Sequence, residues 1–446
     1  MRDSTAAFCA AAALAVSQAG PALAAPLAGT LPVTEHVLPN GLKVLMLERH
    51  TAPVVSFQVW YRVGSRNEDV GKSGVSHLLE HLLFQGSKHF PAGAYDRTVE
   101  RHGGNNNAFT TEDYTAYYVN FPSDKLELAA RLEADRMTGA LVPAAKFASE
   151  LGVVKEERRW RTDNDPFGMM WEMLGATAYA AHPYRWPIVG WMSDLDAMTH
   201  ADAVAYYKAH YQPNNAVVVV VGDFETSKAL DVVKKTFGAL PRGPVARRAI
   251  PQEPPQKGER RTEVIRDVAT PAVMLAYHMG PKGGADFFPL AVIDRILSSG
   301  RSSRLHHDLV YTRKWAQEVG TNAGENADPG LFLAYAVPMP GRTAADLESE
   351  LIKALDRLKT EDVADRELQK AINQVEAKFY FSQQKNYALG TAIGSAEAQG
   401  SWRFVNDYVT RIRAVTKADI RRVAAQTFTR QNRSVITLVP AKELQP

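Results

Sequence analysis

The sequence predicts an α+β protein built from two similar domains, and three observations support this fold class. Strand-like and helix-like patterns alternate along the chain. A proline-rich segment divides the chain near its middle. A set of residues in the first half recurs in the same order in the second half.

The first 24 residues have the features of a cleavable signal peptide. Their apolar run, residues 6–16, is shorter than the roughly 18 residues that a membrane-spanning helix needs. The Ala-Leu-Ala sequence at residues 22–24 matches the pattern that signal peptidases recognise. We therefore expect cleavage after residue 24 and a periplasmic or secreted protein without a membrane span. A poorly ordered alanine-rich terminus is the alternative, because Asp3 offsets the charge of Arg2.

The first domain is expected to span residues 32–240 and to begin with strands. Two segments rich in β-branched and aromatic residues predict strands over residues 42–47 and 54–61. Helical patterns follow over about residues 73–84 and 124–137. Strands followed by helices predict an antiparallel-rich sheet packed with helices.

The composition changes over residues 241–261, which contain five prolines among arginine, glutamine and glycine. Such a segment is typical of a semi-rigid linker. It separates the first domain from a second one, expected over residues 262–446, and each domain has an ordinary size.

An internal repeat supports this division, because six residues recur at a constant offset of 217 positions. Each copy begins with a threonine and an aspartate that together form a helix capping box, and each ends in a valine-rich strand. The six residues are Thr199, Ala201, Asp202, Tyr211, Asn215 and Val218, which recur as Thr416, Ala418, Asp419, Phe428, Asn432 and Val435.

Composition and charge exclude several classes of protein. With 45% hydrophobic and 23% charged residues, the chain is neither disordered nor fibrous. The 52 Lys and Arg residues nearly balance the 49 Asp and Glu residues, without long blocks of one sign. We therefore expect no binding to nucleic acid.

The most informative residues are His77, Glu80 and His81, which lie in a predicted helix. At about 100° per residue these three share one face and leucines occupy the other, so the two imidazoles can bind one metal ion. Glu80 can then act on a water molecule without ligating the metal. This order is the H-x-x-E-H motif, the reverse of the zincin motif. An amphipathic helix with two surface histidines is the alternative interpretation.

A catalytic zinc takes three protein ligands and keeps a fourth position open. Glu150 and Glu157 are seven residues apart in a strongly helical segment and therefore share a face. We assign Glu157 as the third ligand and Glu150 as a carboxylate that supports a liganding histidine. The alternative is a solvent-exposed acidic face paired with the basic residues between positions 155 and 159.

The sequence resembles the pitrilysin or M16 metallopeptidases, and within them the processing-peptidase-like members, over nearly all of the chain after residue 24. The segments that carry the resemblance are residues 38–42 (LPNGL), 63–68 (VGSRNE), 77–81 (HLLEH), 107–110 (NAFT), 154–158 (VKEER) and 182–184 (HPY). The resemblance implies two domains of the M16 type and one Zn²⁺ per chain.

The resemblance also assigns roles to individual residues. It implies zinc ligation by His77, His81 and Glu157, with Glu80 as the general base and Glu150 in support. It further implies that the segment Asn107, Ala108 and Phe109 binds extended peptide substrate. Main-chain pairing to an edge strand is a physically reasonable way to bind peptides of varied sequence.

The sequence departs from the family at one important place. Active members usually supply an arginine and a tyrosine, seven residues apart, from the second homologous unit or from a partner chain. The landmark at residues 302–305 places Val310 and Gln317 at these positions, and neither can replace the expected side chain. Arg304 and Tyr311 are also seven residues apart, but their use would shift the predicted helix by six residues.

We therefore expect a zinc endopeptidase that cleaves extended or unfolded peptides in a chamber shared with a second M16-like chain. This partner would lack the zinc motif and supply the arginine and the tyrosine. A self-sufficient homodimer that uses Arg304 and Tyr311 is one alternative. A non-catalytic peptide-binding or structural subunit is another, although such structural subunits commonly lose the metal motif that is intact here.

Overall fold

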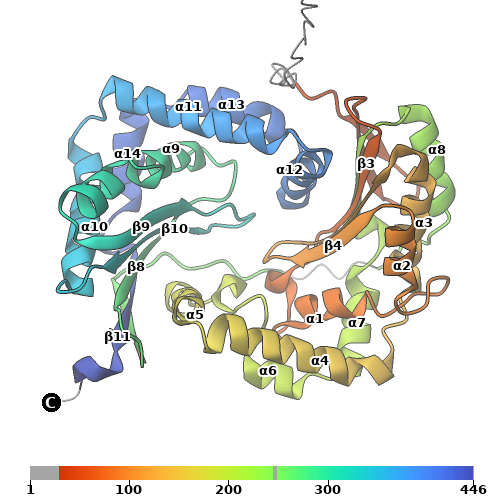
Figure 1. The fold of residues 1–446 in the computed structure, drawn as a ribbon, viewed down its shortest axis with the longest axis horizontal. Helices are drawn as coiled ribbons and strands as arrows, with labels where there is room; N and C mark the ends of the chain where they lie inside the picture. The colour runs from red at the N-terminus through yellow and green to blue at the C-terminus, as the bar shows by residue number, and fades with distance from the viewer. Residues whose placement is uncertain (1–29, 245–248, 445–446) are drawn as a thin grey trace, which may run out of the picture.

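The computed structural model describes residues 30–244 and 249–444, so the predicted signal peptide lies outside the described residues. Two sheets, each packed with helices, lie on opposite sides of the molecule (Figure 1). The predicted α+β fold class is therefore confirmed. Within the described ranges, no helix combines the length and the apolar character needed to cross a membrane.

The N-terminal sheet has six strands in the order β1-β2-β6-β3-β5-β4. These strands are β1 (Thr34–Val37), β2 (Lys43–Glu48), β3 (Val54–Tyr61), β4 (Asn105–Thr110), β5 (Thr115–Pro122) and β6 (Ala216–Gly222). The two predicted strands correspond to β2 and β3, which are not neighbours in the sheet. The valine run of β6 is buried along its whole length and lies between them, parallel to β2.

The described part of the first half contains eight α-helices. They are α1 (Val75–Leu82), α2 (Ala94–Arg101), α3 (Leu126–Gly139), α4 (Ala144–Arg158), α5 (Pro166–Ala178), α6 (Met192–Ala197), α7 (His200–His210) and α8 (Thr226–Phe237). The two predicted helices correspond to α1 and α3. The leucines of α1 are buried in the core beneath the sheet, which fixes the helix. Its polar face is directed towards the cavity between the two halves.

The second half repeats this plan with a five-stranded sheet in the order β7-β11-β8-β10-β9. Its strands are β7 (Arg260–Arg266), β8 (Ala272–His278), β9 (Ala316–Ala323), β10 (Leu331–Pro338) and β11 (Arg433–Pro440). Its helices are α9 (Phe287–Ser298), α10 (Ala344–Thr360), α11 (Asp365–Ser382), α12 (Asn386–Gln399), α13 (Phe404–Arg413) and α14 (Lys417–Thr427). The strand order equals that of the first sheet without β1, and both predicted capping boxes are present.

The two halves exchange one helix each. Helix α12 of the second half packs on the N-terminal sheet, where Leu389 and Ile393 share a core with Trp60. Helix α5 of the first half packs on the C-terminal sheet through Met170 and Leu174. Figure 1 shows both helices between the two sheets. Each half therefore depends on the other to cover its sheet, although the predicted limits at residues 240 and 262 stay a prediction.

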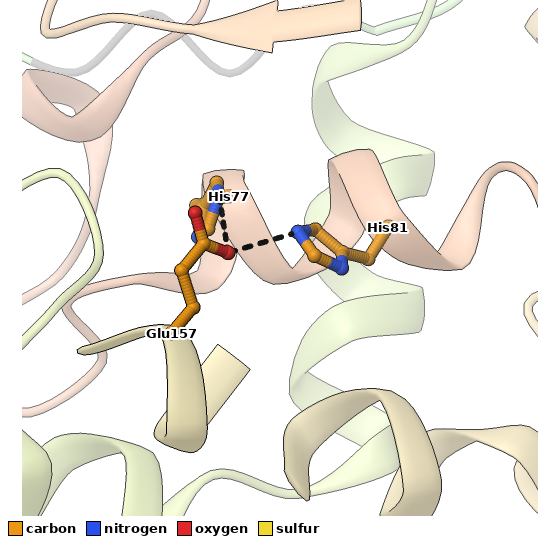
Figure 2. Close-up of side chains that lie close together, drawn as sticks. All are labelled: His77, His81 and Glu157. Atoms are coloured by element: carbon orange, nitrogen blue, oxygen red, sulfur yellow. Dashed lines mark ion pairs between the residues drawn. The ribbon is translucent and has the colours of Figure 1, made fainter. Parts of the chain in front are cut away.

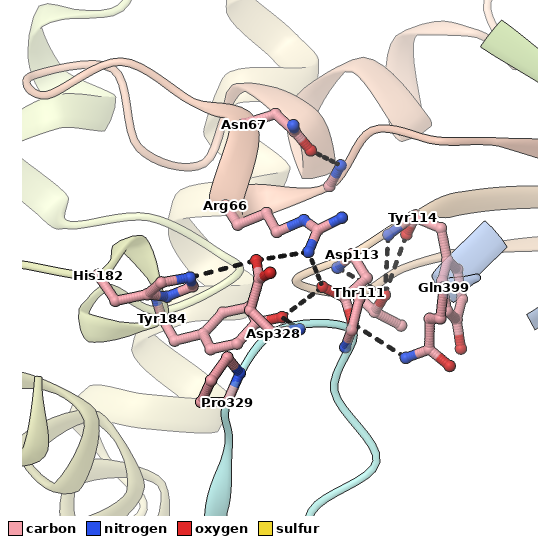
Figure 3. A network of polar contacts seen from close by, with 12 residues as sticks. Arg66, Asn67, Thr111, Asp113, Tyr114, His182, Tyr184, Asp328, Pro329 and Gln399 are labelled. Atoms are coloured by element: carbon pink, nitrogen blue, oxygen red, sulfur yellow. Dashed lines mark hydrogen bonds and ion pairs between the residues drawn. The ribbon is translucent and has the colours of Figure 1, made fainter. Parts of the chain in front are cut away.

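A buried polar network also joins the halves (Figure 3). Asp113 is only 2% exposed and lies beside Arg66 at 3.1 Å. Its carboxylate accepts hydrogen bonds from Tyr184 Oη at 2.5 Å and from Ala327 N at 2.8 Å. Arg66 reaches across to Asp328 at 2.6 Å. The loop between β9 and β10 is thus held against the first half.

Candidate metal centre

The start of α1 is positioned by backbone contacts that few residue types allow. Gly74 precedes the helix with φ +90°, and a Cβ there would lie 2.4 Å from the carbonyl oxygen of Val189. The buried Glu68 carboxylate accepts hydrogen bonds from Gly74 N and Ser76 N, each at 2.8 Å. Burial raises the pKa of Glu68 to about 8. These contacts fix the helix that carries the H-x-x-E-H motif.

The structure brings the three predicted metal ligands together (Figure 2). Glu157 Oε2 lies 3.6 Å from His77 Nε2 and 3.5 Å from His81 Nε2. One ligand atom from each side chain lies within 4.8 Å of the others. Four-coordinate zinc with bonds of about 2.0–2.2 Å separates neighbouring ligands by roughly 3.3–3.6 Å. The donor set therefore fits one zinc ion, and the two distances from Glu157 match the spacing of zinc ligands.

Protonation favours metal binding at two of the three predicted ligands, His77 and Glu157. Burial, with a contribution from His81, lowers the pKa of His77 to about 4. Burial also opposes the charged form of His81, but nearby carboxylates, Glu157 foremost, outweigh it and raise the pKa of that imidazole. Contact with His81 lowers the pKa of Glu157 despite its partial burial. His77 is thus neutral and Glu157 ionised near pH 7, the forms that bind metals.

Glu150 lies beside His81, as the sequence predicts. Its Oε2 is 3.7 Å from His81 Nδ1, a charge contact rather than a hydrogen bond, and its Oε1 accepts a hydrogen bond from Gln85. Glu150 and Glu157 are both partly buried, which differs from the alternative interpretation of a solvent-exposed acidic face. Lys155 pairs with Asp196, and the other two basic residues of that segment also have partners elsewhere on α4 and α5.

Sequence reasoning missed Arg161, which pairs with Glu157 Oε1 at 2.6 Å. Arg161 lies in the short π-helical segment η3 (Arg159–Asp163) that continues α4. Its spacing of four residues from Glu157 was a usable signal, because residues at i and i+4 are neighbours on a helix.

The general-base candidate Glu80 is held by a residue of the edge strand. Thr110 Oγ1 donates a hydrogen bond of 2.6 Å to Glu80 Oε2. Burial raises the pKa of Glu80, and this hydrogen bond opposes the effect. Thr110 lies in the NAFT segment that marks the sequence, but its contact with a residue 30 positions away could not be deduced from the sequence pattern.

The three predicted ligands line a cavity of about 860 Å³ between the two halves. Asn107, Ala108 and Phe109 of β4 line it, as expected for the predicted substrate-binding segment. The opposite wall comes from the second half, with Asn322 of β9 and Leu331 of β10. Sequence reasoning did not foresee that both halves of one chain would form this cavity.

The second-half residues that the sequence relates to the family's arginine and tyrosine lie away from the cavity, namely Arg304, Val310, Tyr311 and Gln317. Arg304 makes two hydrogen bonds to Glu367, at 2.8 and 2.7 Å. Tyr311 is 72% exposed, and Val310 packs against the core of the second half. Of the residues that line the cavity, none belongs to this set.

Comparison with known proteins identifies the family. A family model described as "Insulinase (Peptidase family M16)" matches residues 43–190, and one described as "Peptidase M16 inactive domain" matches residues 197–375. Zinc protease PqqE of Helicobacter pylori is 34% identical over 418 residues, covering 92% of this chain and 94% of the relative. The chain belongs to peptidase family M16.

Solved structures agree with this M16 assignment. A protease from Helicobacter pylori superimposes with a TM-score of 0.87 and 32% identity, covering 92% of this chain and 99% of the other. The first half of the periplasmic protease PqqL from Escherichia coli gives a TM-score of 0.76 at 19% identity, covering 94% of each chain. The second likeness concerns the fold alone. The family and the two M16-type domains predicted from the sequence are thus confirmed.

Proposed function

We propose that this M16 chain is a zinc endopeptidase that hydrolyses peptide bonds in extended or unfolded peptides. The observation that carries the proposal is the convergence of His77, His81 and Glu157 beside Glu80 in one cavity. The three ligands would hold one zinc ion. When bound, zinc lowers the pKa of water to roughly 7 and polarises a peptide carbonyl.

The chain's own residues supply the base and bind the peptide. Thr110 holds Glu80 Oε2, so that Oε1 is the oxygen that takes a proton from the attacking water and passes it to the leaving amine. Strand β4 pairs only with β5 among the described strands, which leaves its other edge open along Asn107, Ala108 and Phe109. An extended peptide can add to this edge through main-chain hydrogen bonds.

A second M16-like chain without the zinc motif is proposed to complete the site. The tetrahedral oxyanion formed during hydrolysis needs a donor, and the family pattern expects an arginine and a tyrosine. Val310 packs against a core, Gln317 donates to a backbone oxygen, and Arg304 is bound to Glu367. These contacts support the heterodimer over a homodimer that uses Arg304 and Tyr311.

A self-sufficient peptidase is the second candidate, and Arg161 favours it. This guanidinium lines the cavity and lies next to the ligand Glu157, where it could donate to an oxyanion. If the chain acts alone, Arg161→Lys is expected to lower kcat strongly while zinc content stays unchanged.

We also propose that the chain is exported and cleaved after residue 24. The sequence of the first 24 residues supports this, and the structural neighbour PqqL is described as a periplasmic protease. Amino-terminal sequencing of protein purified from the cell envelope fraction would test it, and a chain that begins at residue 1 would contradict it.

The central test is hydrolysis of a quenched fluorescent peptide library by the zinc-loaded chain, with Glu80→Gln as the matched control. Hydrolysis that disappears in Glu80→Gln while one zinc per chain is retained supports the proposed base. Activity of the chain alone would argue against the partner. One bound zinc without turnover supports the heterodimer and directs the search to the second chain. A chain that binds no zinc would contradict the whole proposal.

A further inference from the structure

The turn between β4 and β5 places Glu112 in the wall of the metal cavity. The proposed mechanism does not use this carboxylic acid. Glu112 lines the cavity, and no described residue forms an ion pair with it. The other carboxylates of the wall are engaged. Glu157 pairs with Arg161, Glu172 is bound twice by Arg158, and Glu80 accepts the hydroxyl of Thr110.

Arg66 contacts the backbone of Glu112, but its guanidinium pairs with other carboxylates. Arg66 donates its backbone N–H to the carbonyl of Glu112 at 3.0 Å, but its guanidinium is directed to Asp113 and Asp328. Burial raises the pKa of Glu112, a hydrogen bond from its own backbone N–H opposes this effect, and the negative charge of Asp113 adds to it. A carboxylate that is largely removed from water without a cation beside it is unfavourable. In a cavity that admits ligands, a bound cation can relieve this cost.

The position of Glu112 relates it to the proposed reaction. It follows Thr110, the residue in contact with Glu80, by two positions along the chain. A strand advances about 3.3 Å per residue, so a peptide lying along β4 with its scissile bond at Glu80 brings a neighbouring residue past Glu112.

We propose that Glu112 is a specificity-determining residue that binds a cationic nitrogen of the substrate, within about three residues of the scissile bond. The cation is either the side chain of lysine or arginine or a free α-amino group. This inference rests on the proposed function and names a feature of its substrates.

The test measures peptide binding rather than turnover, so that it stays separate from the test of hydrolysis. The zinc-loaded Glu80→Gln chain binds fluorescent peptides that differ only by lysine or norleucine at one position, each with a free or an acetylated amino terminus. We expect the peptide that presents the cation to bind roughly tenfold or more tightly, as for a charge-assisted hydrogen bond. The acetylated pair distinguishes a side-chain cation from an amino terminus.

Substitutions then assign the preference to Glu112. Glu112→Gln keeps the shape of the side chain and is expected to abolish the preference without changing the affinity for the neutral peptide. Glu325→Gln is the matched control, because Glu325 lies in the loop that borders the cavity but pairs with Lys282 at 3.0 Å and does not line the wall. This control is expected to keep the preference. Glu112→Lys should instead favour a peptide with glutamate at the test position.

Several results would overturn the inference. These are equal binding of cationic and neutral peptides, absence of binding of either peptide, or a preference that persists in Glu112→Gln. Zinc content and the unfolding midpoint of Glu112→Gln verify that the variant is folded. A clear preference in a chain that never hydrolyses peptides would count against the proposed function alone, whereas hydrolysis without any preference would count against Glu112 alone.

Discussion

The contacts of Asp113 predict a large loss of stability for Asp113→Asn. The carboxylate is 2% exposed and lies in the network between the two halves. It accepts hydrogen bonds from Tyr184 Oη, Ala327 N and Gln399 Nε2, and it pairs with Arg66. Asparagine has nearly the same shape, but its amide group presents N–H donors where one carboxylate oxygen accepts donors.

The expected loss follows from the burial of this network. Arg66 keeps Asp328 as a partner, so the expected loss comes mainly from the buried donors that would face the new amide group, at about 1–3 kcal/mol for each group left unsatisfied. Asp286→Asn is the matched control, since Asp286 pairs with Arg422 at the surface, with both side chains more than 40% exposed. An exposed pair contributes less than about 1 kcal/mol.

Urea unfolding of the metal-free chain, followed by far-ultraviolet circular dichroism, gives the free energy of unfolding of each variant. We expect Asp113→Asn to lower it several times more than Asp286→Asn does. A loss no larger than that of the control would refute the reasoning, because the network would then contribute no more than surface charges do.

Three further variants test the metal centre. Gly74→Ala should lower the free energy of unfolding by at least about 1–3 kcal/mol and weaken zinc binding in calorimetric titrations, because its φ is +90° and its Cβ would meet a backbone oxygen. The control Gly152→Ala, with open space around its Cβ, should do neither. Thr110→Val should lower kcat roughly tenfold or more at unchanged zinc affinity, whereas Thr110→Ser should keep the kcat of the parent chain. Equal kcat values for Thr110→Val and the parent chain would contradict the role of this hydroxyl in holding Glu80. Burial raises the pKa of Glu68 from 4.5 to about 8, so its contribution to stability is complete below pH 4.5 and is lost as the pH rises towards 8. Glu68→Gln should flatten this decline in unfolding free energy between pH 5 and pH 9. An unchanged slope would argue against Glu68 as its source.

Local patterns in the sequence predicted much of the structure because they depend on neighbouring residues. The face shared by His77, Glu80 and His81 follows from helical periodicity, and the capping box at Thr199 follows from local hydrogen bonding. The seven-residue spacing of Glu150 and Glu157 likewise predicted that these two acids share a face, and both lie beside the histidines.

Non-local features could not be predicted in this way. Nothing in the apolar pattern of β6 indicates that it lies between β2 and β3. The apolar residues of α5 and α12 predict burial but do not say which sheet they cover. The partners of Thr110 and Asp113 also come from distant parts of the chain, so only the folded structure reveals them.

The exchange of α5 and α12 has a consequence for the order in which the chain can fold during synthesis. One face of the N-terminal sheet stays uncovered until α12 (Asn386–Gln399) has been made, long after β6 completes that sheet at Gly222. At roughly 5–20 residues per second, this delay is on the order of ten seconds. During that time an apolar surface is exposed to association with other chains, and a chaperone that covers it would raise the yield of folded protein.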